Sequence, residues 1–528
     1  MTSKAELQKG LTVESSSIQE PFLKSSDAFN KKDLIEVENG NEILSKKMFL
    51  INNAIDEIGF TWYHAKLFCI SGFGYSADSQ LEMIQSSVSL YVNYQFGRSF
   101  PVATEIFYVG LLFGSLFWGL GGDIIGRKIA FNWSLFLAAL FGFFVGGMNS
   151  YATYCIFLFL NAACAGGNLA LDVAVFLEYL PSKYQWLNTF LAAWWGIGQT
   201  IAVALAWAFI PNFSCDLEGD CPSSSNRGWR YCWYANSAIC MCGALVRLLF
   251  FKLDETPKFL VSNGRDEEAV ESLRKIALKY DRPFSLTLED LESCGELLDV
   301  FKKTKHELGQ DESLWSKAIS TWKLIKKHVK ILFATKLVAY STSLILWSWF
   351  LIGLAYDTFY NFLYIYIAEK GGNVNSVSMV YRDPVIANFV GIWSPMLAAA
   401  MVFIPKCGRR GTMAFGAVSS MAILFGYTTV RSAAGDAGFS SATYFFINIY
   451  YACLYAYTPE VFPAQARTTG TALAVTMARV GGVVTPVIYY YGQESGSSVP
   501  IWVCGAAVGT LAVTSLMMPF EPTLQRTV

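Results

Sequence analysis

The sequence predicts an all-α membrane protein in which twelve transmembrane helices form two pseudo-symmetric six-helix bundles. Three observations support this fold class: an apolar composition, twelve apolar stretches of spanning length, and short motifs that recur about 280 residues apart. Of the 528 residues, 53% are hydrophobic and 15% are charged. Soluble domains carry about 25% charged residues. The formal net charge of −1 gives no indication of nucleic-acid binding.

The apolar stretches set the predicted organisation, because a helix needs roughly 20 mostly apolar residues to cross a bilayer. They are 64–89, 101–120, 129–149, 152–180, 188–210, 229–251, 331–368, 384–404, 412–430, 439–458, 469–491 and 499–518. The predicted parts are a cytosolic tail (1–63), two six-helix bundles (64–251 and 331–518), a cytosolic linker (252–330) and a C-terminal cytosolic tail (519–528). The first tail is expected to be mobile, with short amphipathic turns near its end, and the linker to be a solvated connector.

Lysine and arginine near the span ends predict the orientation, because cytosolic loops carry an excess of both. The short loops assigned to the inside hold Arg127, Lys128, Lys183, Lys406, Arg409, Arg410 and Arg467. Both termini are therefore predicted to be cytosolic. The plasma membrane is the default location, and an internal membrane is the alternative.

The loop at 211–228 is predicted to face outside. Asn212-Phe213-Ser214 is an acceptor sequence for N-glycosylation, although Asn212 would lie very close to the bilayer. Cys215 and Cys221 lie in the same polar loop and could pair in an oxidising compartment or stay reduced.

An internal repeat relates the two halves. Gly74-x3-Asp78-x3-Glu82 matches Gly353-x3-Asp357-x3-Asn361 at an offset of about 279, and Gly126-Arg127-Lys128 matches Gly408-Arg409-Arg410 at about 282. The segments 178–181 (Glu-Tyr-Leu-Pro) and 460–463 (Glu-Val-Phe-Pro) share the second offset. A duplicated six-helix unit of this kind encloses a central cavity near the bilayer midplane, around which the halves can rock.

Several motifs resemble one family. The segment from Gly119 to Lys128 looks like the loop signature of the major facilitator superfamily. Segments 254–265 and 459–467 look like motifs of its sugar-porter-type members, and 166–168, 178–181 and 477–482 resemble its synaptic-vesicle-protein-related branch. The resemblance implies twelve helices, alternating access and often proton coupling, and leaves the substrate open. Pro405 and Leu158 depart from the family pattern, and Leu158 stands where relatives often carry an arginine linked to proton coupling.

The charged motifs at the predicted cytosolic span ends form a candidate gate. In one state, ion pairs within this set would close the inner face; the alternative is that they only set topology and loop stability. The set is Asp123, Gly126, Arg127, Lys128, Glu178, Glu255, Arg409, Arg410, Glu460 and Arg467.

Polar residues inside the predicted spans form a candidate cavity for substrate and protons. A charge at the bilayer centre costs at least ~2.5–3.5 kcal/mol, so such residues should face a cavity or a partner. Arg479 is taken as the one deep basic residue and is expected to neutralise one carboxylate, which leaves an acidic surplus for a proton or a cationic group. Structural ion pairs are the alternative. The set is Asp78, Glu82, Asn168, Asp172, Gln199, Asp357, Asn361 and Arg479.

Aromatic residues in the same spans are candidates for the cavity wall, because their rings can stack on a sugar or hold a cation. Trp194, Tyr356, Trp393 and Tyr455 are the candidates. Ordinary core packing is the alternative for each of them.

Together these features predict a secondary active transporter of a small polar organic solute. Proton symport and an organic cation or amine are favoured, and a sugar, a carboxylate or a non-transporting sensor are the alternatives. No nucleophile–base set, nucleotide loop or metal spacing is recognisable, so an enzyme and a cofactor are not expected. The expected partners are the solute, protons and the lipid bilayer, and the protein is expected to function as a monomer.

Overall fold

The structure is a computed structural model. It describes residues 42–125, 127–215, 221–250, 254–262, 264–295, 326, 328–371, 377–404, 407–430, 432–462, 466–494 and 498–521. All regular elements in these ranges are helical, and each predicted span coincides with one helix or with two helices in line.

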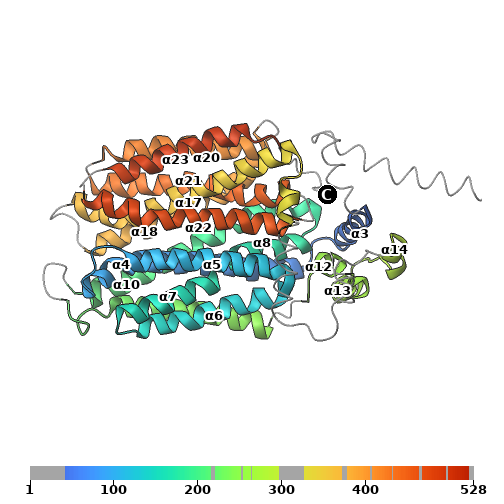
Figure 1. Ribbon diagram of the computed structural model, residues 1–528, viewed down its shortest axis with the longest axis horizontal. Helices are drawn as coiled ribbons and strands as arrows, with labels where there is room; N and C mark the ends of the chain where they lie inside the picture. The colour runs from blue at the N-terminus through green and yellow to red at the C-terminus, as the bar shows by residue number, and fades with distance from the viewer. Residues whose placement is uncertain are drawn as a thin grey trace, which may run out of the picture.

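The first half contains helices α4 to α11, which form the blue and green part of Figure 1. Their bounds are α4 (Trp62–Gln95), α5 (Val102–Ile125), α6 (Arg127–Gly147), α7 (Tyr151–Ala165), α8 (Asn168–Tyr179), α9 (Trp186–Leu191), α10 (Ala193–Phe213) and α11 (Gly228–Leu245). A π-helical turn, η2 (Val246–Phe250), continues α11. The 3-10 turn η1 (Ser182–Tyr184) joins α8 to α9.

The second half contains helices α17 to α23, which form the yellow to red part of Figure 1. Their bounds are α17 (Lys336–Gly371), α18 (Val377–Gly391), α19 (Ser394–Val402), α20 (Gly408–Tyr427), α21 (Ala433–Val461), α22 (Arg467–Glu494) and α23 (Val499–Met517). The halves lie side by side with their helices roughly along one common direction (Figure 1). They meet where α5 packs on α22 and where α10 packs on α18.

Apolar length alone identifies only part of the bundle. Within the described ranges, eight helices or helix pairs are long and apolar enough to cross a membrane. Helix α4 is not among them, because its buried face carries many polar side chains, including Asp78, Gln80 and Glu82. The helix is buried on all sides over its middle turns, so these polar side chains face the protein interior rather than lipid.

Two glycines break the fourth predicted span into α7 and α8. A Cβ at Gly166 would come within 2.3 Å of the Leu111 carbonyl oxygen, and one at Gly167 within 2.1 Å of the Trp118 Cβ. Both neighbours belong to α5, so the break lets α5 approach the backbone more closely than any larger residue would allow.

Helices α3 (Glu42–Ile58), α12 (Pro257–Ser262), α13 (Asp266–Lys279) and α14 (Leu288–Ser293) gather at one end of the bundle in Figure 1. We call this the linker end, and the opposite one the far end. Because α3 is amphipathic, it buries Ile51 and Ile55. Its Lys47 forms an ion pair with Asp266 of α13.

The tail predicted for 1–63 is therefore packed rather than mobile over Glu42–Ile58, and the short amphipathic turns expected near Ser45–Ile58 are one continuous helix. Asp56 of α3 accepts hydrogen bonds from the backbone nitrogen and the hydroxyl of Ser182, at 2.7 and 2.8 Å. Helix α3 thus connects the linker helices to the loop that follows α8.

Candidate substrate and coupling site

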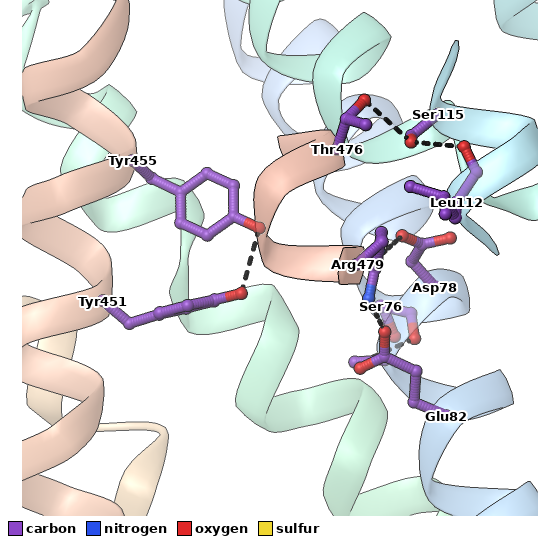
Figure 2. A network of polar contacts seen from close by, with 10 residues as sticks. Ser76, Asp78, Glu82, Leu112, Ser115, Tyr451, Tyr455, Thr476 and Arg479 are labelled. Carbon is purple, nitrogen blue, oxygen red and sulfur yellow. Dashed lines mark hydrogen bonds and ion pairs between the residues drawn. The ribbon is translucent and has the colours of Figure 1, made fainter. Parts of the chain in front are cut away.

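A buried ion triad joins the two halves. Asp78 and Glu82 lie four residues apart on one face of α4, and Arg479 of α22 lies between their carboxylates (Figure 2). Arg479 Nη2 is 3.2 Å from Asp78 Oδ2, and Nη1 contacts Glu82 Oε1. All three side chains are buried. Arg479 therefore neutralises one of the two negative charges, and a proton or a cation would be required to neutralise the second.

An aromatic cavity lies next to the triad. It is lined by Tyr75, Ala192, Trp195, Pro395, Asn448, Tyr451, Ala452 and Tyr455, which come from both halves. Its volume of about 10 Å³ holds about one water molecule. The rings of Tyr75 and Tyr455 meet across it, with their centroids 5.7 Å apart. Because Tyr75 precedes Asp78 by three residues on α4, the cavity and the triad share one helix face.

Hydrogen bonds connect the cavity wall across the halves. Trp195 Nε1 donates to the Tyr356 hydroxyl at 3.0 Å, and that hydroxyl donates to Gln199 Oε1 at 3.1 Å. The Tyr360 hydroxyl also donates to Gln199 Oε1, at 3.2 Å. The buried amide of Gln199 on α10 therefore anchors two tyrosines of α17.

Asp357, the repeat partner of Asp78, is buried near the same boundary. A Cβ at Gly482 of α22 would lie 2.6 Å from Asp357 Oδ2 and 2.6 Å from the ring of Tyr108. Glycine at this position thus lets a carboxylate of the second half and a ring of the first half approach the same point of α22. The side chain of Asn361 lies outside the described residues.

The structure places Asp172 and Asn168 inside the first half rather than at the cavity wall. Asp172 Oδ1 is 2.9 Å from Arg247 Nη2, and both side chains are fully buried. Arg247 also donates to the carbonyl oxygens of Ile70 and Phe131. Asn168 accepts a hydrogen bond from Ser134 of α6.

The expectation that Arg479 is the one deep basic residue is therefore wrong, because Arg247 in the π-helical turn η2 is buried as completely. Arg247 takes up the charge of Asp172, so Arg479 remains available for Asp78 and Glu82. The signal was present in the sequence as an arginine inside the apolar stretch 229–251.

Of the four predicted ring positions, only Tyr455 lines the cavity. Tyr356 lies behind the wall and accepts a hydrogen bond from the lining residue Trp195. The side chain of Trp393 is 53% exposed, so the expectation that it lines the cavity is wrong. Trp194 packs against Phe68 and against the backbone at Gly72 of α4. Its neighbour Trp195 faces the cavity instead. Adjacent residues of a helix point in different directions, so only one of these two tryptophans can face the cavity. The composition of the sequence does not show which one does.

The charged motifs cluster at the linker end. In the first half, Arg127 pairs with Glu178, and Glu255 Oε1 accepts the backbone N–H groups of Arg127 and Lys128 at 3.1 and 3.3 Å. This carboxylate caps the start of α6, where the helix dipole favours negative charge. Gly126 and the side chain of Asp123 lie outside the described residues.

The second half repeats this arrangement with a residue that the sequence analysis missed. Arg409 pairs with Glu460 at 2.5 Å. Glu521 accepts the backbone N–H groups of Arg409 and Arg410 at 2.6 and 3.2 Å, and so caps α20 as Glu255 caps α6. Arg467 begins α22 at the same end of the bundle.

The halves contact each other on both sides of the cavity. At the linker end, Arg409 Nη1 donates to the Thr189 hydroxyl of α9 at 2.9 Å. Towards the far end, the Tyr381 hydroxyl donates to the Ser87 carbonyl oxygen at 3.0 Å, and Trp207 Nε1 donates to the Ser378 hydroxyl at 3.0 Å. The conformation is therefore a closed one around a small central cavity.

The far end holds the cysteine loop. Cys215 and Cys221 form a disulfide with a Cα–Cα distance of 5.5 Å. Asn212 lies one turn earlier, in the last turn of α10, with its side chain exposed.

Two helical halves that meet around a buried charged and aromatic site are the architecture of a membrane transporter. The chain belongs to the Major Facilitator Superfamily, whose model matches residues 67–486. It is thus an integral multi-pass membrane protein and a secondary transporter, not an enzyme.

Known proteins refine this placement. MFS siderochrome iron transporter 1 of Ceriporiopsis subvermispora is 37% identical over 507 residues, covering 95% of each chain. The Synaptic vesicle 2-related protein of Bos taurus is 24% identical over 489 residues, covering 90% of this chain and 81% of its own. The synaptic-vesicle-related branch is thus more distant than predicted. The fold matches the proton:xylose symporter XylE of E. coli, with a TM-score of 0.62 at 16% identity, over 88% of this chain and 98% of that one.

Proposed function

We propose that the protein transports a small organic cation or amine, coupled to protons, through the cavity between its halves. The observation that carries this proposal is the triad, in which two buried carboxylates share one guanidinium. An incoming cation or a proton would supply the missing positive charge, whereas an anion would increase the imbalance.

The aromatic wall supports a cationic substrate. Tyr75, Tyr451, Tyr455 and Trp195 surround the cavity, and ring faces attract cations by about 2 kcal/mol or more when water is excluded. Asp357 adds a third buried carboxylate close to the boundary of the halves. The cavity in this closed state is too small for a solute, so binding would require the halves to separate.

A ferric siderochrome is the second candidate substrate, since the Ceriporiopsis subvermispora relative carries that name at 37% identity. Such an iron chelate is cargo rather than a cofactor. It would occupy the same space between the halves, and only an open state could admit it.

We further propose that the linker end faces the cytosol, with both termini inside and the protein functional as a monomer in the plasma membrane. The basic residues of the linker-end loops support this orientation. The disulfide at the far end suits an oxidising outer side. The Arg409–Thr189 contact between the halves would then be part of the inner gate. The ion pairs Arg127–Glu178 and Arg409–Glu460, each within one half, would hold the gate residues in place. A glycan on Asn212 would lie outside.

Uptake into proteoliposomes tests the proposal. Tetraethylammonium, glucose, succinate and a ferric siderochrome would be compared with and without an inward proton gradient. We expect saturable, gradient-stimulated uptake of the cation, and loss of the stimulation in Asp78→Asn and Asp357→Asn. Asp436→Asn is the control, because Asp436 is also buried but lies in the first turn of α21. Uptake of glucose or succinate alone would contradict the cation assignment, and uptake of the siderochrome alone would establish the second candidate.

A further inference from the structure

We propose that Arg479 is a built-in counterion that the transported cation displaces from Asp78 and Glu82. This inference rests on the proposed cation transport and adds a mechanism to it. Arg479 would occupy the cation site in the empty carrier, and so would let the empty carrier close and return. The substrate site and the Arg479 site would be the same pair of carboxylates.

The first support is the position of this ion pair between the halves. Arg479 connects α22 of the second half to α4 of the first. By contrast, the pairs Arg247–Asp172 and Arg127–Glu178 stay within the first half, and Arg409–Glu460 stays within the second. Separation of the halves therefore breaks the Arg479 contacts and leaves those three pairs intact.

The second support is that Arg479 cannot follow α4 on its own. A Cβ at Gly353 of α17 would lie 2.2 Å from the Ala478 carbonyl oxygen, and one at Gly481 would lie 2.5 Å from the Phe350 carbonyl oxygen. These close contacts lock α22 onto α17 on both sides of Arg479. When the halves separate, Arg479 must move with the second half.

The third support is the unfilled bonding capacity of the triad. Asp78 Oδ1 and Arg479 Nε are buried and have no hydrogen-bond partner among the described residues. Unpaired polar atoms at such a depth are costly. The Asp172–Arg247 pair has equivalent unpaired atoms, Asp172 Oδ2 and Arg247 Nε, so this feature supplies an unused acceptor at the triad and does not by itself set the triad apart. Asp78 Oδ1 is thus a carboxylate oxygen that can face an incoming cation before Arg479 leaves.

The fourth support is access from the cavity. Tyr75 lines the cavity one helical turn before Asp78, and Tyr455 touches Tyr75 from the second half. A cation held among these rings lies on the α4 face that also carries both carboxylates. Displacement of Arg479 then exchanges one positive charge for another, so two buried negative charges need not be exposed to each other.

Removal of the Arg479 counterion should slow net uptake of the cation but not the exchange of external for internal cation. In Arg479→Gln, the empty carrier would hold two carboxylates without a cation, so its return should become slow. Net uptake of tetraethylammonium should fall at least tenfold, because the free-energy cost of leaving a buried charge unpaired exceeds the free energy that corresponds to a tenfold change. Exchange of external for internal tetraethylammonium should stay within about twofold, because both directions carry a cation in the site.

The affinity for the cation is a second readout. If Arg479 only stabilised the fold, its removal would not make the cation bind more tightly. With the competing guanidinium removed, the apparent Kd for tetraethylammonium, measured by equilibrium binding in nanodiscs, should fall about tenfold. Arg479→Lys should restore net uptake, because it retains a positive charge. Arg247→Gln is the matched control: it removes an equally buried guanidinium from a pair inside one half, and should lower stability without increasing affinity.

The outcomes are distinguishable. Loss of both net uptake and exchange in Arg479→Gln, with weaker binding of the cation, would overturn this inference and leave the transport proposal standing. Failure of the unmodified protein to take up or exchange tetraethylammonium would overturn the proposed substrate class and the inference with it.

Discussion

Substitution of Gly74 by alanine tests whether the stability of the first half depends on the buried Asp172–Arg247 ion pair, which packs against the α4 backbone at Gly74. A Cβ at this position would lie 1.7 Å from Asp172 Oδ2 and 2.2 Å from Arg247 Nη2, far closer than atoms can approach. Either α4 moves away or the pair breaks. Breaking a fully buried pair costs about 3–5 kcal/mol, and the better helix propensity of alanine returns about 1 kcal/mol. The expected net loss is roughly 2–4 kcal/mol.

Thermal unfolding in nanodiscs at a fixed scan rate, followed by tryptophan fluorescence, measures this loss as a lower apparent Tm. Gly438→Ala in α21 is the control, because a Cβ there would meet nothing within 4 Å. It should leave the Tm unchanged or slightly raised. Adding Asp172→Ala and Arg247→Leu to Gly74→Ala should recover part of the loss, since an apolar replacement of a buried pair is often neutral. Equal Tm values for the two glycine variants would refute the reasoning.

Three further outcomes are expected. Trp195→Phe removes the hydrogen bond that fixes this cavity-lining ring to Tyr356 and should raise the KM for uptake by roughly threefold to tenfold, whereas the exposed Trp393→Phe should not change it; equal effects would contradict the placement of the two rings. Glu521→Gln removes the charged cap of α20 and should lower stability by about 1 kcal/mol, seen as a lower Tm; an unchanged Tm would mean that the cap is redundant. Burial, and then repulsion from neighbouring arginines, lowers the pKa of the Lys258 ammonium on α12 to about 7. This folded-state pKa lies below the unfolded value of about 10.4. The free-energy cost of burying the charged ammonium is therefore full below about pH 7, and it decreases as the pH rises from about 7 to about 10.4. Lys258→Met should therefore raise the Tm more at pH 6 than at pH 9, and an equal gain at both would contradict the pKa argument.

The spans could be predicted because apolar length is a local property of the chain, and each predicted stretch falls on a helix or a helix pair. The breaks inside the spans could not, because they depend on a neighbour. Gly166 and Gly167 interrupt the fourth span where α5 crosses it, and one sequence does not reveal which helix lies there. Helix α3 was predicted only as short amphipathic turns for a related reason: the partners that hold it lie more than 120 residues away in the chain, at Ser182 and Asp266.

The site was predictable to the level of a helix face. The four-residue spacing of Asp78 and Glu82 placed both carboxylates on one side of α4, which is where the structure has them. Which carboxylates Arg479 would bind could not be predicted, since the answer depends on how α22 packs against α4. Arg247 was overlooked although it stands in an apolar stretch, where an ionisable residue always requires an explanation.

Some charged contacts are repeated in both halves, and the contacts of Arg479 are not. Glu255 and Glu521 cap the equivalent helices α6 and α20, so the linker end of each half is built on the same plan. Inside the bundle the symmetry fails. Asp78 and its repeat partner Asp357 are both buried carboxylates, but α22 directs Arg479 to Asp78 and Glu82 and presents Gly482 to Asp357. A carrier with such a pair across its halves would exchange that positive charge when the halves separate. Substrate recognition and conformational change would then depend on the same two carboxylates of α4, which is the property that Arg479→Gln isolates.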